Sequence, residues 1–510
     1  MSASDNNKRI AKNTLMLYFR MIFLMLVSLY TSRVVLNALG VEDYGIYNVV
    51  GGVVAMFSIL SGSLSSAISR FITFELGRGD IDKLKKVFSA SVTIQMLLSA
   101  IIVVLIEIIG VWFLNNKMVI PPERIYAANW VLQLSVVTFV VNLISIPYNA
   151  AIVAHEHMSA FAYISILEAV GKLLVAFLIT RSPIDKLIFY AILLTVIAVL
   201  IRMVYGWYCN KKFIECHYHF RWDKSLLKEM FGFAGWNYIG NSSVLLRDQG
   251  GNIIINLFFG PAVNAARGVA VQVQHTITGF VTNFMTALNP QITKSYASGN
   301  HKYMMTLIFQ GARLSFYMLL ILSLPVLLDT HYILVLWLKL IPEHTVPFIR
   351  LSLLFSLLDS ISYPMITAML ATGRIRNYQI IVGGSNMMNL PLSYFFLYLG
   401  YAPETVFIIA IVISQICLAA RLYMLRGMIN LRVRDFIKKV YLNVLFVGTI
   451  SSVVPWYISV ILDDSLFNFI FLCLISILFT STTIYFVGCN RGEREKVKTY
   501  ILNFKKKVFK

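Results

Sequence analysis

The segment from Phe231 to Pro290 reads FGFAGWNYIGNSSVLLRDQGGNIIINLFFGPAVNAARGVAVQVQHTITGFVTNFMTALNP. It is apolar enough to lie in a membrane, yet polar side chains recur at spacings of four, seven, four and four: Asn237, Asn241, Asp248, Asn252 and Asn256. At 3.6 residues per turn these positions fall on one helical face. Because polar groups are costly in hydrocarbon, this face is expected to meet water, protein or a substrate. The rest of the chain is therefore expected to build a scaffold around a polar cavity.

The composition of the chain is that of a multi-pass membrane protein. Of its 510 residues, 58% are hydrophobic and only 13% are charged, whereas about a quarter of a soluble domain is charged. Apolar runs of about 20 residues recur along nearly the whole length, which is typical of transmembrane helices. The net charge of +20 is spread over short loops, which indicates membrane topology rather than nucleic-acid binding.

Fourteen membrane spans are predicted, and the fold class is an all-α integral membrane protein. An even number places both termini on one side of the membrane. Lys and Arg concentrate in the N-terminus, the even-numbered loops and the C-terminus, so the positive-inside rule places both termini in the cytoplasm. The predicted spans are roughly 14–37, 44–69, 87–114, 126–148, 158–180, 187–209, 231–257, 263–289, 304–328, 345–371, 379–399, 405–427, 440–461 and 467–489.

An internal repeat relates the two halves of the chain. Matching residues recur at an offset of 220, as in Gly40 and Gly260 or Gly79 and Gly299. Further matches recur at an offset of 217: Ser145 and Ser362, and Pro147 and Pro364. Spans 1–6 therefore correspond to spans 7–12, and the paired prolines suggest equivalent bends or simple helix ends. Since six is even, the halves are expected to form two six-helix lobes related by a pseudo-twofold axis along the membrane normal. The predicted organisation is an N-lobe (1–209), a cytoplasmic linker (210–230), a C-lobe (231–427), spans 13–14 (428–489) and a basic cytoplasmic tail (490–510).

Two N-terminal motifs carry a resemblance to a known family. The stretches TSRVVLNALGVEDYGIYNVVGG (Thr31 to Gly52) and RFITFELGRGD (Arg70 to Asp80) resemble the polysaccharide repeat-unit (O-antigen) flippases of Bacteroidetes-like bacteria. These flippases belong to the multidrug, oligosaccharidyl-lipid and polysaccharide (MOP) exporter superfamily. The arrangement of twelve spans in two repeats plus two further spans is similar to theirs along the whole chain.

The resemblance implies a flippase of the bacterial inner membrane, and not an enzyme. It implies that an oligosaccharide linked to undecaprenyl pyrophosphate moves from the cytoplasmic to the periplasmic leaflet by alternating access between two lobes. The implied partners are this lipid-linked oligosaccharide, membrane lipids, a coupling H⁺ or Na⁺, and polysaccharide polymerase and chain-length proteins. No cofactor, metal or nucleic acid is expected.

The resemblance also points to intramembrane arginines as ligands of the pyrophosphate. In the related lipid II flippases such arginines lie on spans 1, 2, 7 and 8; here Arg20 and Arg33 match span 1, Arg247 matches span 7 and Arg267 matches span 8. Arginine suits a pyrophosphate because its planar, permanently charged fork donates hydrogen bonds in pairs. The alternatives are an interhelical ion pair, or snorkelling from a span end, which is the leading interpretation for Arg33 and Arg421.

Asp248 follows Arg247 directly, and neighbours on a helix point about 100° apart, so the two are expected to face different surroundings. Asp248 lies on the asparagine face with the candidate substrate contacts Asn241 and Asn252, and we therefore assign it to the cavity. There it is either a ligand of the coupling ion or the ion-pair partner of an arginine on another span.

Three further charged residues lie within spans. Glu168 and Lys172 have the favourable i, i+4 order of a helical ion pair; alternatively, Lys172 lines the cavity and Glu168 relays a proton. Asp359 has no charged neighbour on its own face, and a lone buried carboxylate tends to stay protonated, which suits a proton-coupled switch. A neutral, hydrogen-bonded Asp359 is the alternative.

The trio His155–His157 lacks the HExxH spacing of a zinc helix, so no metal site is expected.

Two other functions compete with the flippase. An ion-coupled multidrug exporter of the same superfamily typically has twelve spans, so spans 13–14 and the intramembrane arginines favour an anionic lipid substrate. A membrane-embedded glycosyltransferase or polysaccharide polymerase usually needs a sizeable outer loop with catalytic carboxylates, and the outer loops of this chain are short. No GxxxxGK[ST] phosphate loop occurs in the sequence, so direct use of ATP is not expected.

Overall fold

The computed structural model describes residues 3–55, 58–116, 118, 120–220, 222–338, 341–463, 465–495 and 498. Within these residues the secondary structure is helical and includes no strand, which confirms the predicted all-α class. The chain divides into two compact units. The first consists of Met1–Ser242 and Thr286–Asn300, and the second of Ser243–Met285 and His301–Lys510.

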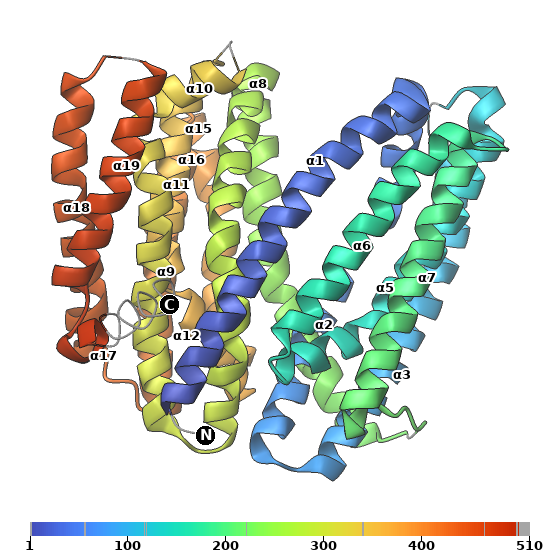
Figure 1. Cartoon of the computed structure of the whole chain (residues 1–510), viewed down its shortest axis with the longest axis horizontal. Helices are drawn as coiled ribbons and strands as arrows, with labels where there is room; N and C mark the ends of the chain where they lie inside the picture. Colours follow the sequence, from blue (N-terminus) through green and yellow to red (C-terminus); the bar gives the residue numbers. More distant parts are fainter. Residues whose placement is uncertain are drawn as a thin grey trace, which may run out of the picture. The chain divides into compact units, whose positions relative to one another are not determined.

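The first unit is a set of long helices in which α1 lies against α6 and α5 packs against α7 (Figure 1). A π-turn, η1 (Ile106–Gly110), joins α3 to α4, so these elements form one span. The short 3₁₀ segments η2 (Pro122–Arg124), η3 (Ile179–Arg181) and η4 (Ile214–Cys216) lie at the ends of α5, α6 and α7. The helices are α1 (Ala3–Ala55), α2 (Ser58–Arg78), α3 (Ile81–Leu105), α4 (Val111–Asn116), α5 (Ile125–Ala154), α6 (Met158–Leu178) and α7 (Lys186–Lys212).

Aliphatic side chains from α1, α3, α5 and α7 fill one core of the first unit. Val50, Ile102, Leu132 and Leu187 are all completely buried there. The same helices expose large apolar side chains on their other faces, such as Ile101 and Ile108. An apolar interior combined with an apolar exterior is what a helix surrounded by lipid requires, because the hydrocarbon solvates the outward side chains.

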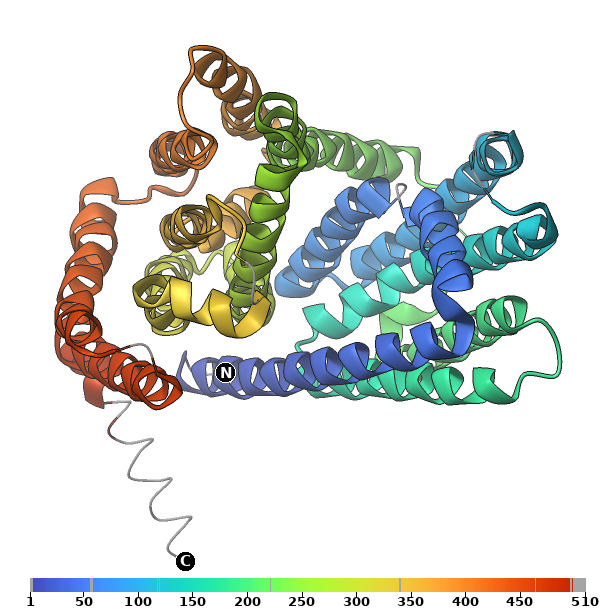
Figure 2. The same cartoon turned by 90° about the horizontal axis from the view of Figure 1, so that it is seen from above.

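Helix α8 (Lys224–Ala297) belongs to both units, since Lys224–Ser242 and Thr286–Ala297 pack with the first unit and the middle with the second. It is broken at Gly260, whose φ of 77° is left-handed, and α1 is broken in the same way at Gly40, with φ of 83°. Figure 2 shows α1 turning sharply after its long first part. A left-handed backbone costs other residues about 1–2 kcal/mol, so glycine is favoured at both breaks.

The same offset of 220 relates the glycines that follow α2 and α8. Gly79 and Gly299 have φ of 76° and 73°. The repeat found in the sequence is therefore also present in the backbone, because both pairs of equivalent glycines adopt the same rare conformation. The lobe boundaries and the axis between the lobes stay predictions, whereas the two units of the structure divide within α8.

Among its described residues, the second unit contains one bent helix pair and several longer spans. Figure 1 shows α18 and α19 side by side, and both also pack against α9. The π-turns η5 (Gln379–Gly383), η6 (Ile437–Tyr441) and η7 (Ile484–Gly488) continue neighbouring helices. The helices are α9 (His301–Leu328), α10 (Thr330–Leu338), α11 (Thr345–Ser360), α12 (Tyr363–Thr372), α13 (Arg376–Tyr378), α14 (Gly384–Met387), α15 (Asn389–Tyr398), α16 (Thr405–Ile429), α17 (Val433–Phe436), α18 (Leu442–Ile461) and α19 (Leu466–Thr483).

Ten helices of the described residues are long and apolar enough to cross a membrane, or eleven if the bent pair α11–α12 is one span. The predicted count of fourteen is therefore not confirmed. The three predicted spans outside this set are 44–69, 231–257 and 263–289, which are helical wherever the structure describes them. The polar faces of 231–257 and 263–289 lower their apolar character, whereas 44–69 includes residues 56 and 57, which lie outside the described residues.

The equivalent prolines differ in their effect on the backbone. Pro147 lies inside the continuous helix α5, whereas Pro364 lies in the first turn of α12, after a bend of 44° between α11 and α12. Proline suits the first turn of a helix, since its missing N–H has no partner there. A broken span therefore occurs at Pro364 and not at Pro147.

Candidate functional site

A cavity of about 320 Å³ lies within the second unit. The middle part of α8 lines it on both sides of Gly260, and α11, α12, α15 and α16 supply the remaining walls. Several of the predicted site residues line it, together with others that the sequence did not single out. The ionisable lining residues are Arg247, Asp248, Arg267, His275, Asp359 and Tyr363.

Arg247 and Asp248 form an ion pair with each other, with 2.9 Å between Nε and Oδ1. The expectation that these neighbours face different surroundings is therefore wrong. Their Cα–Cβ bonds diverge on the helix, but the long arginine side chain reaches across to the adjacent carboxylate. The Arg247 guanidinium also lies 4.9 Å from the ring centre of Phe355. Both charges line the same cavity and largely compensate one another.

Arg267 is only 6% exposed, and its guanidinium is held by neutral acceptors. It donates to the Asn252 side-chain oxygen and, over 2.9 Å, to the backbone oxygen of Asp248. Its Nε has no hydrogen-bond partner among the described residues. A Cβ atom added to Gly251 would lie 2.8 Å from Arg267 Nη2, so glycine gives the guanidinium its space. Arg267 thus brings a positive charge to the cavity wall with no carboxylate bonded to it.

Asp359 is not a lone carboxylate. No residue of its own helix carries a compensating charge nearby, but Arg247 of α8 and Arg421 of α16 both interact with it electrostatically. The snorkelling expected of Arg421 is wrong, because this residue is only 5% exposed. Tyr378 also interacts electrostatically with Arg421. Burial of Arg421 is therefore compensated by a carboxylate and a phenol that lie far away in the sequence.

The first unit has a cavity of about 250 Å³ that corresponds to this one through the repeat. Its lining residue Tyr47 is related to Arg267 by the offset of 220, and Asn142 is related to Asp359 by the offset of 217. Lys172 matches Asn389 at the same offset of 217, and both again line their cavities. The repeat therefore builds the same kind of cavity twice, with different charges in equivalent places.

Glu168 and Lys172 form an ion pair of 2.6 Å on one face of α6, and both line the cavity of the first unit. The sequence leaves a helical ion pair and a cavity lining open as alternatives for these two residues, and the structure combines both. On the opposite wall, the hydroxyls of Thr138 and Thr195 lie 2.9 Å apart. This cavity is thus polar, and its two opposite charges are paired.

The remaining predicted residues lie outside both cavities. Arg20 lies over the ring of Phe161 at 4.5 Å, and its Nε has no hydrogen-bond partner among the described residues. Arg33 is exposed. Asn241 donates to the Ser63 hydroxyl over 2.9 Å. The predicted asparagine face therefore splits along α8, since its first part contacts α2 and its second part contacts Arg267.

A buried charge cluster around Glu156 was not expected. The Glu156 carboxylate is completely buried and lies 2.8 Å from Arg9 and 2.7 Å from Lys294. Gln291 also donates to it, over 2.7 Å. The flanking histidines contact Glu215 and Tyr208, so the side chains of the trio 155–157 diverge instead of converging on one point. This cluster joins α1, the turn between α5 and α6, and the end of α8 within the first unit.

A second unexpected feature is a clamp at Arg124, which lies just before α5. Its guanidinium forms a two-pronged contact with Asp43 of α1, at 2.8 and 2.6 Å, and also pairs with Asp185. Burial raises the pKa of Asp185, but the contact with Arg124 outweighs this effect and holds that pKa below its ordinary value. At offsets of 220 and 219 the equivalent positions hold His344 and Glu404, which lie 2.6 Å apart. Recognition of these matched offsets in the sequence would have identified both clamps.

The cavities, the broken helices and the apolar spans together define a multi-pass membrane transporter. Residues 10–296 match the model of the family described as polysaccharide biosynthesis protein, and the chain belongs to this family. The chain is also 22% identical, over 303 residues, to the uncharacterized membrane protein EpsK of Bacillus subtilis (strain 168). The match covers 59% of each chain, so the chain spans about three-fifths of the length of this relative.

Solved structures with a similar fold are transporters. A MATE protein in the bent conformation has a TM-score of 0.73 at 13% identity, over 86% of this chain and 97% of that one. An outward-facing multidrug resistance MATE family transporter of the MOP superfamily has a TM-score of 0.71 at 14% identity, with coverage of 83% and 96%. A MOP superfamily transporter from Pyrococcus furiosus, described by the reverse polarity of its binding pocket, has a TM-score of 0.68 at 14% identity, over 84% of this chain and 96% of that one. The predicted MOP-type polysaccharide family and the predicted all-α fold are confirmed, and the family and the MATE-like fold both indicate a transporter rather than an enzyme.

Proposed function

We propose that the protein is a flippase of the bacterial inner membrane. It translocates an oligosaccharide repeat unit linked to undecaprenyl pyrophosphate from the cytoplasmic to the periplasmic leaflet by alternating access, with both termini in the cytoplasm. The observation that carries the proposal is Arg267, a buried arginine in a cavity wall whose hydrogen-bond acceptors are neutral. A guanidinium that is hydrogen-bonded only to neutral acceptors is available to a phosphate oxygen, and Asp248 interacts with it electrostatically without bonding to it. Membership in a polysaccharide biosynthesis family supports the choice of a saccharide-linked pyrophosphate as this anion.

The other site residues have different roles in this proposal. Arg247, compensated by Asp248 in the absence of substrate, exchanges that carboxylate for a pyrophosphate oxygen. Arg20, Arg33, Lys172, Asn241 and Asn252 contact the pyrophosphate or the sugars during passage, and the unpartnered Nε of Arg20 supports its inclusion. Asp248, Asp359 and Glu168 are the candidates for binding a coupling H⁺ or Na⁺, since each lines a cavity. Polymerase and chain-length proteins would receive the product in the periplasm.

A second candidate function is ion-coupled export of drugs. It is favoured by the similarity of the fold to a multidrug resistance MATE family transporter. A cavity for cationic drugs needs uncompensated acidic groups, whereas both cavity carboxylates of the second unit have arginine partners. The charge balance therefore favours the anionic lipid.

The test is transport in proteoliposomes with a fluorescent polyprenyl-pyrophosphate oligosaccharide, scored by its exposure on the opposite leaflet. The protein should accelerate exposure over empty liposomes, and equal rates would refute the flippase. Arg267→Gln should slow transport roughly ten- to a hundredfold, because a hydrogen bond to a charged group is worth about 1.5–3 kcal/mol. Arg426→Gln is the matched control, since Arg426 is exposed on α16 and lines neither cavity. Ion-driven uptake of a cationic dye without lipid flipping would favour the exporter.

A further inference from the structure

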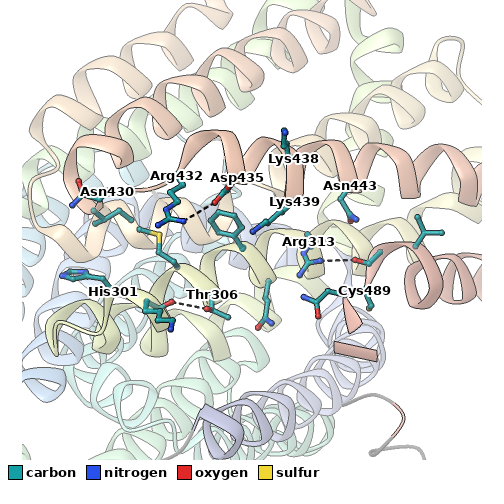
Figure 3. A pocket seen from close by; sticks show the side chains of 18 of the residues that line it. His301, Thr306, Arg313, Asn430, Arg432, Asp435, Lys438, Lys439, Asn443 and Cys489 are labelled. Atoms are coloured by element: carbon teal, nitrogen blue, oxygen red, sulfur yellow. Dashed lines mark hydrogen bonds and ion pairs between the residues drawn. The ribbon is translucent and has the colours of Figure 1, made fainter. Parts of the chain in front are cut away.

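Another large cavity of the second unit lies where α9 begins and η7 ends. Its volume is about 1160 Å³, and it shares no lining residue with the cavity around Arg267. Figure 3 shows its lining side chains between α9 and the segment that continues from α17 into α18. The end of α16 and the segment Val487–Asn490 complete the walls. The walls are thus ends and connections of membrane helices, except that the α9 wall extends inward from His301 to Arg313.

The lining of this cavity is strongly basic. Lys302, Arg313, Arg432, Lys438 and Lys439 line it, against the single carboxylate of Asp435. Arg432 and Asp435 are 3.9 Å apart, and the Arg432 side chain is 86% exposed, so this pair compensates little charge. Neither Lys302 nor Lys439 has an ion-pair partner among the residues that the structure describes. A net positive charge therefore remains for an anionic occupant.

Arg313 is the rigid part of this basic lining. Its side chain is 11% exposed, one nitrogen donates to the backbone oxygen of Gly488 over 3.1 Å, and another pairs with Glu493. Glu493 in turn accepts from Gln310 over 3.2 Å and from the backbone N–H of Asn490 over 2.9 Å. The Nε of Arg313 has no hydrogen-bond partner among the described residues. Arg313 is thus a positive charge held in place on the cavity wall.

The surroundings of the cavity point to a lipid. His301, Lys302 and Asn490 lie at helix ends that the positive-inside rule assigns to the cytoplasmic surface. Next to the lining residues of η6 and α18, large apolar side chains are exposed along the same segment: Ile437 at 40%, Leu442 at 53% and Phe446 at 60%. A basic cavity at the membrane surface that continues into an exposed apolar helix face matches a molecule with an anionic head and hydrocarbon chains.

We propose that this cavity binds the phosphate of an anionic membrane phospholipid of the cytoplasmic leaflet. The phosphate lies among Arg313, Arg432 and Lys439, and the acyl chains extend along the exposed face of α18. The lipid thereby links α9 to the C-terminal pair α18–α19. This inference does not depend on what the protein transports, since the cavity around Arg267 contributes no residue to the phospholipid site.

The test measures phospholipid binding to the full-length protein in detergent by native mass spectrometry. Phosphatidylglycerol should bind, and zwitterionic phosphatidylcholine should bind at least tenfold more weakly. The variant Arg432→Gln/Lys439→Gln should bind phosphatidylglycerol about thirtyfold more weakly, because each basic residue contributes roughly a factor of five near a headgroup. The control Arg434→Gln/Arg426→Gln removes two exposed charges outside the cavity, and it should stay within about twofold of the unchanged protein.

Three results would overturn the proposal. The first is equal binding of the two phospholipids, and the second is equal loss in the cavity variant and its control. The third is binding of glycerol phosphate as tight as that of phosphatidylglycerol, which would identify a site for free phosphate instead of lipid. Size-exclusion elution and the melting temperature of each variant report on folding. Since Arg432 and Lys439 are exposed, both variants should fold normally.

Discussion

Replacement of Glu156 by Gln is expected to destabilise the first unit strongly. The substitution preserves the shape of the side chain and a hydrogen bond to Gln291, but it removes the negative charge between Arg9 and Lys294. The Glu156 side chain is completely buried, while those of Arg9 and Lys294 are 32% and 22% exposed. The variant therefore leaves the mostly buried cations of Arg9 and Lys294 without the carboxylate that lies between them.

The cost can be worked out from these exposures. Breaking a buried ion pair by removing one partner costs about 3–5 kcal/mol, because the remaining charge is uncompensated. Water reaches part of Arg9 and Lys294, which places the cost near the lower end, about 3 kcal/mol. Burial already lowers the pKa of Lys294, and Glu156 opposes this effect, so the variant lowers that pKa further. Loss of the Lys294 proton then limits the cost.

The assay is the melting temperature of the detergent-solubilised protein, followed by tryptophan fluorescence. At about 2 °C per kcal/mol for a unit of this size, Glu156→Gln should melt roughly 6 °C below the unchanged protein. Glu123→Gln is the matched control, because Glu123 is exposed and has no ion-pair partner among the described residues. A shift no larger than that of the control would refute the argument that the cluster stabilises the first unit.

Two further perturbations test the other structural features. Arg124→Gln should lower stability at neutral pH by about 1–2 kcal/mol. Because Arg124 holds the pKa of Asp185 below its ordinary value, this stability difference should persist above about pH 4 and shrink as the pH falls further. Melting curves at several pH values would measure it. Gly260→Ala should cost about 1–2 kcal/mol, because alanine is strained at the positive φ of this position. An added Cβ meets no atom within 4 Å there, so backbone strain alone causes the loss. The control Gly268→Ala, within the same helix, should be neutral or stabilising.

Much of the architecture could be predicted because it depends on patterns that are local in the sequence. Apolar runs and the distribution of Lys and Arg indicate spans, and the offset of 220 correctly pairs Gly40 with Gly260 and Gly79 with Gly299. The same offsets also pair the lining residues of the two cavities, although the sequence alone did not reveal which faces enclose them. The polar faces of 231–257 and 263–289 that predict a site also lower the apolar character of these two spans, so the same residues indicate the site and obscure the span count.

The errors concern side chains that reach beyond their own helical face. The geometry of a helix correctly separates the Cβ atoms of Arg247 and Asp248, but the arginine side chain is long enough to bring its Nε to 2.9 Å from the carboxylate. Arg421 lies near a span end, which suggested snorkelling, but Asp359 and Tyr378 keep it buried. Glu156 meets Lys294 across 138 residues of sequence, and no local pattern predicts that pair.

The repeat separates what is needed to build a cavity from what is needed to act on a substrate. Equivalent positions enclose both cavities, so features common to both belong to the shared scaffold. The charges are not shared: Tyr47 stands where the second unit has Arg267, and Asn142 stands where it has Asp359. Buried charges are costly in a membrane protein and persist where they are compensated or used. The differences between the cavities support our proposal that Arg267 of the second unit is the main anion ligand, since its hydrogen-bond acceptors are neutral.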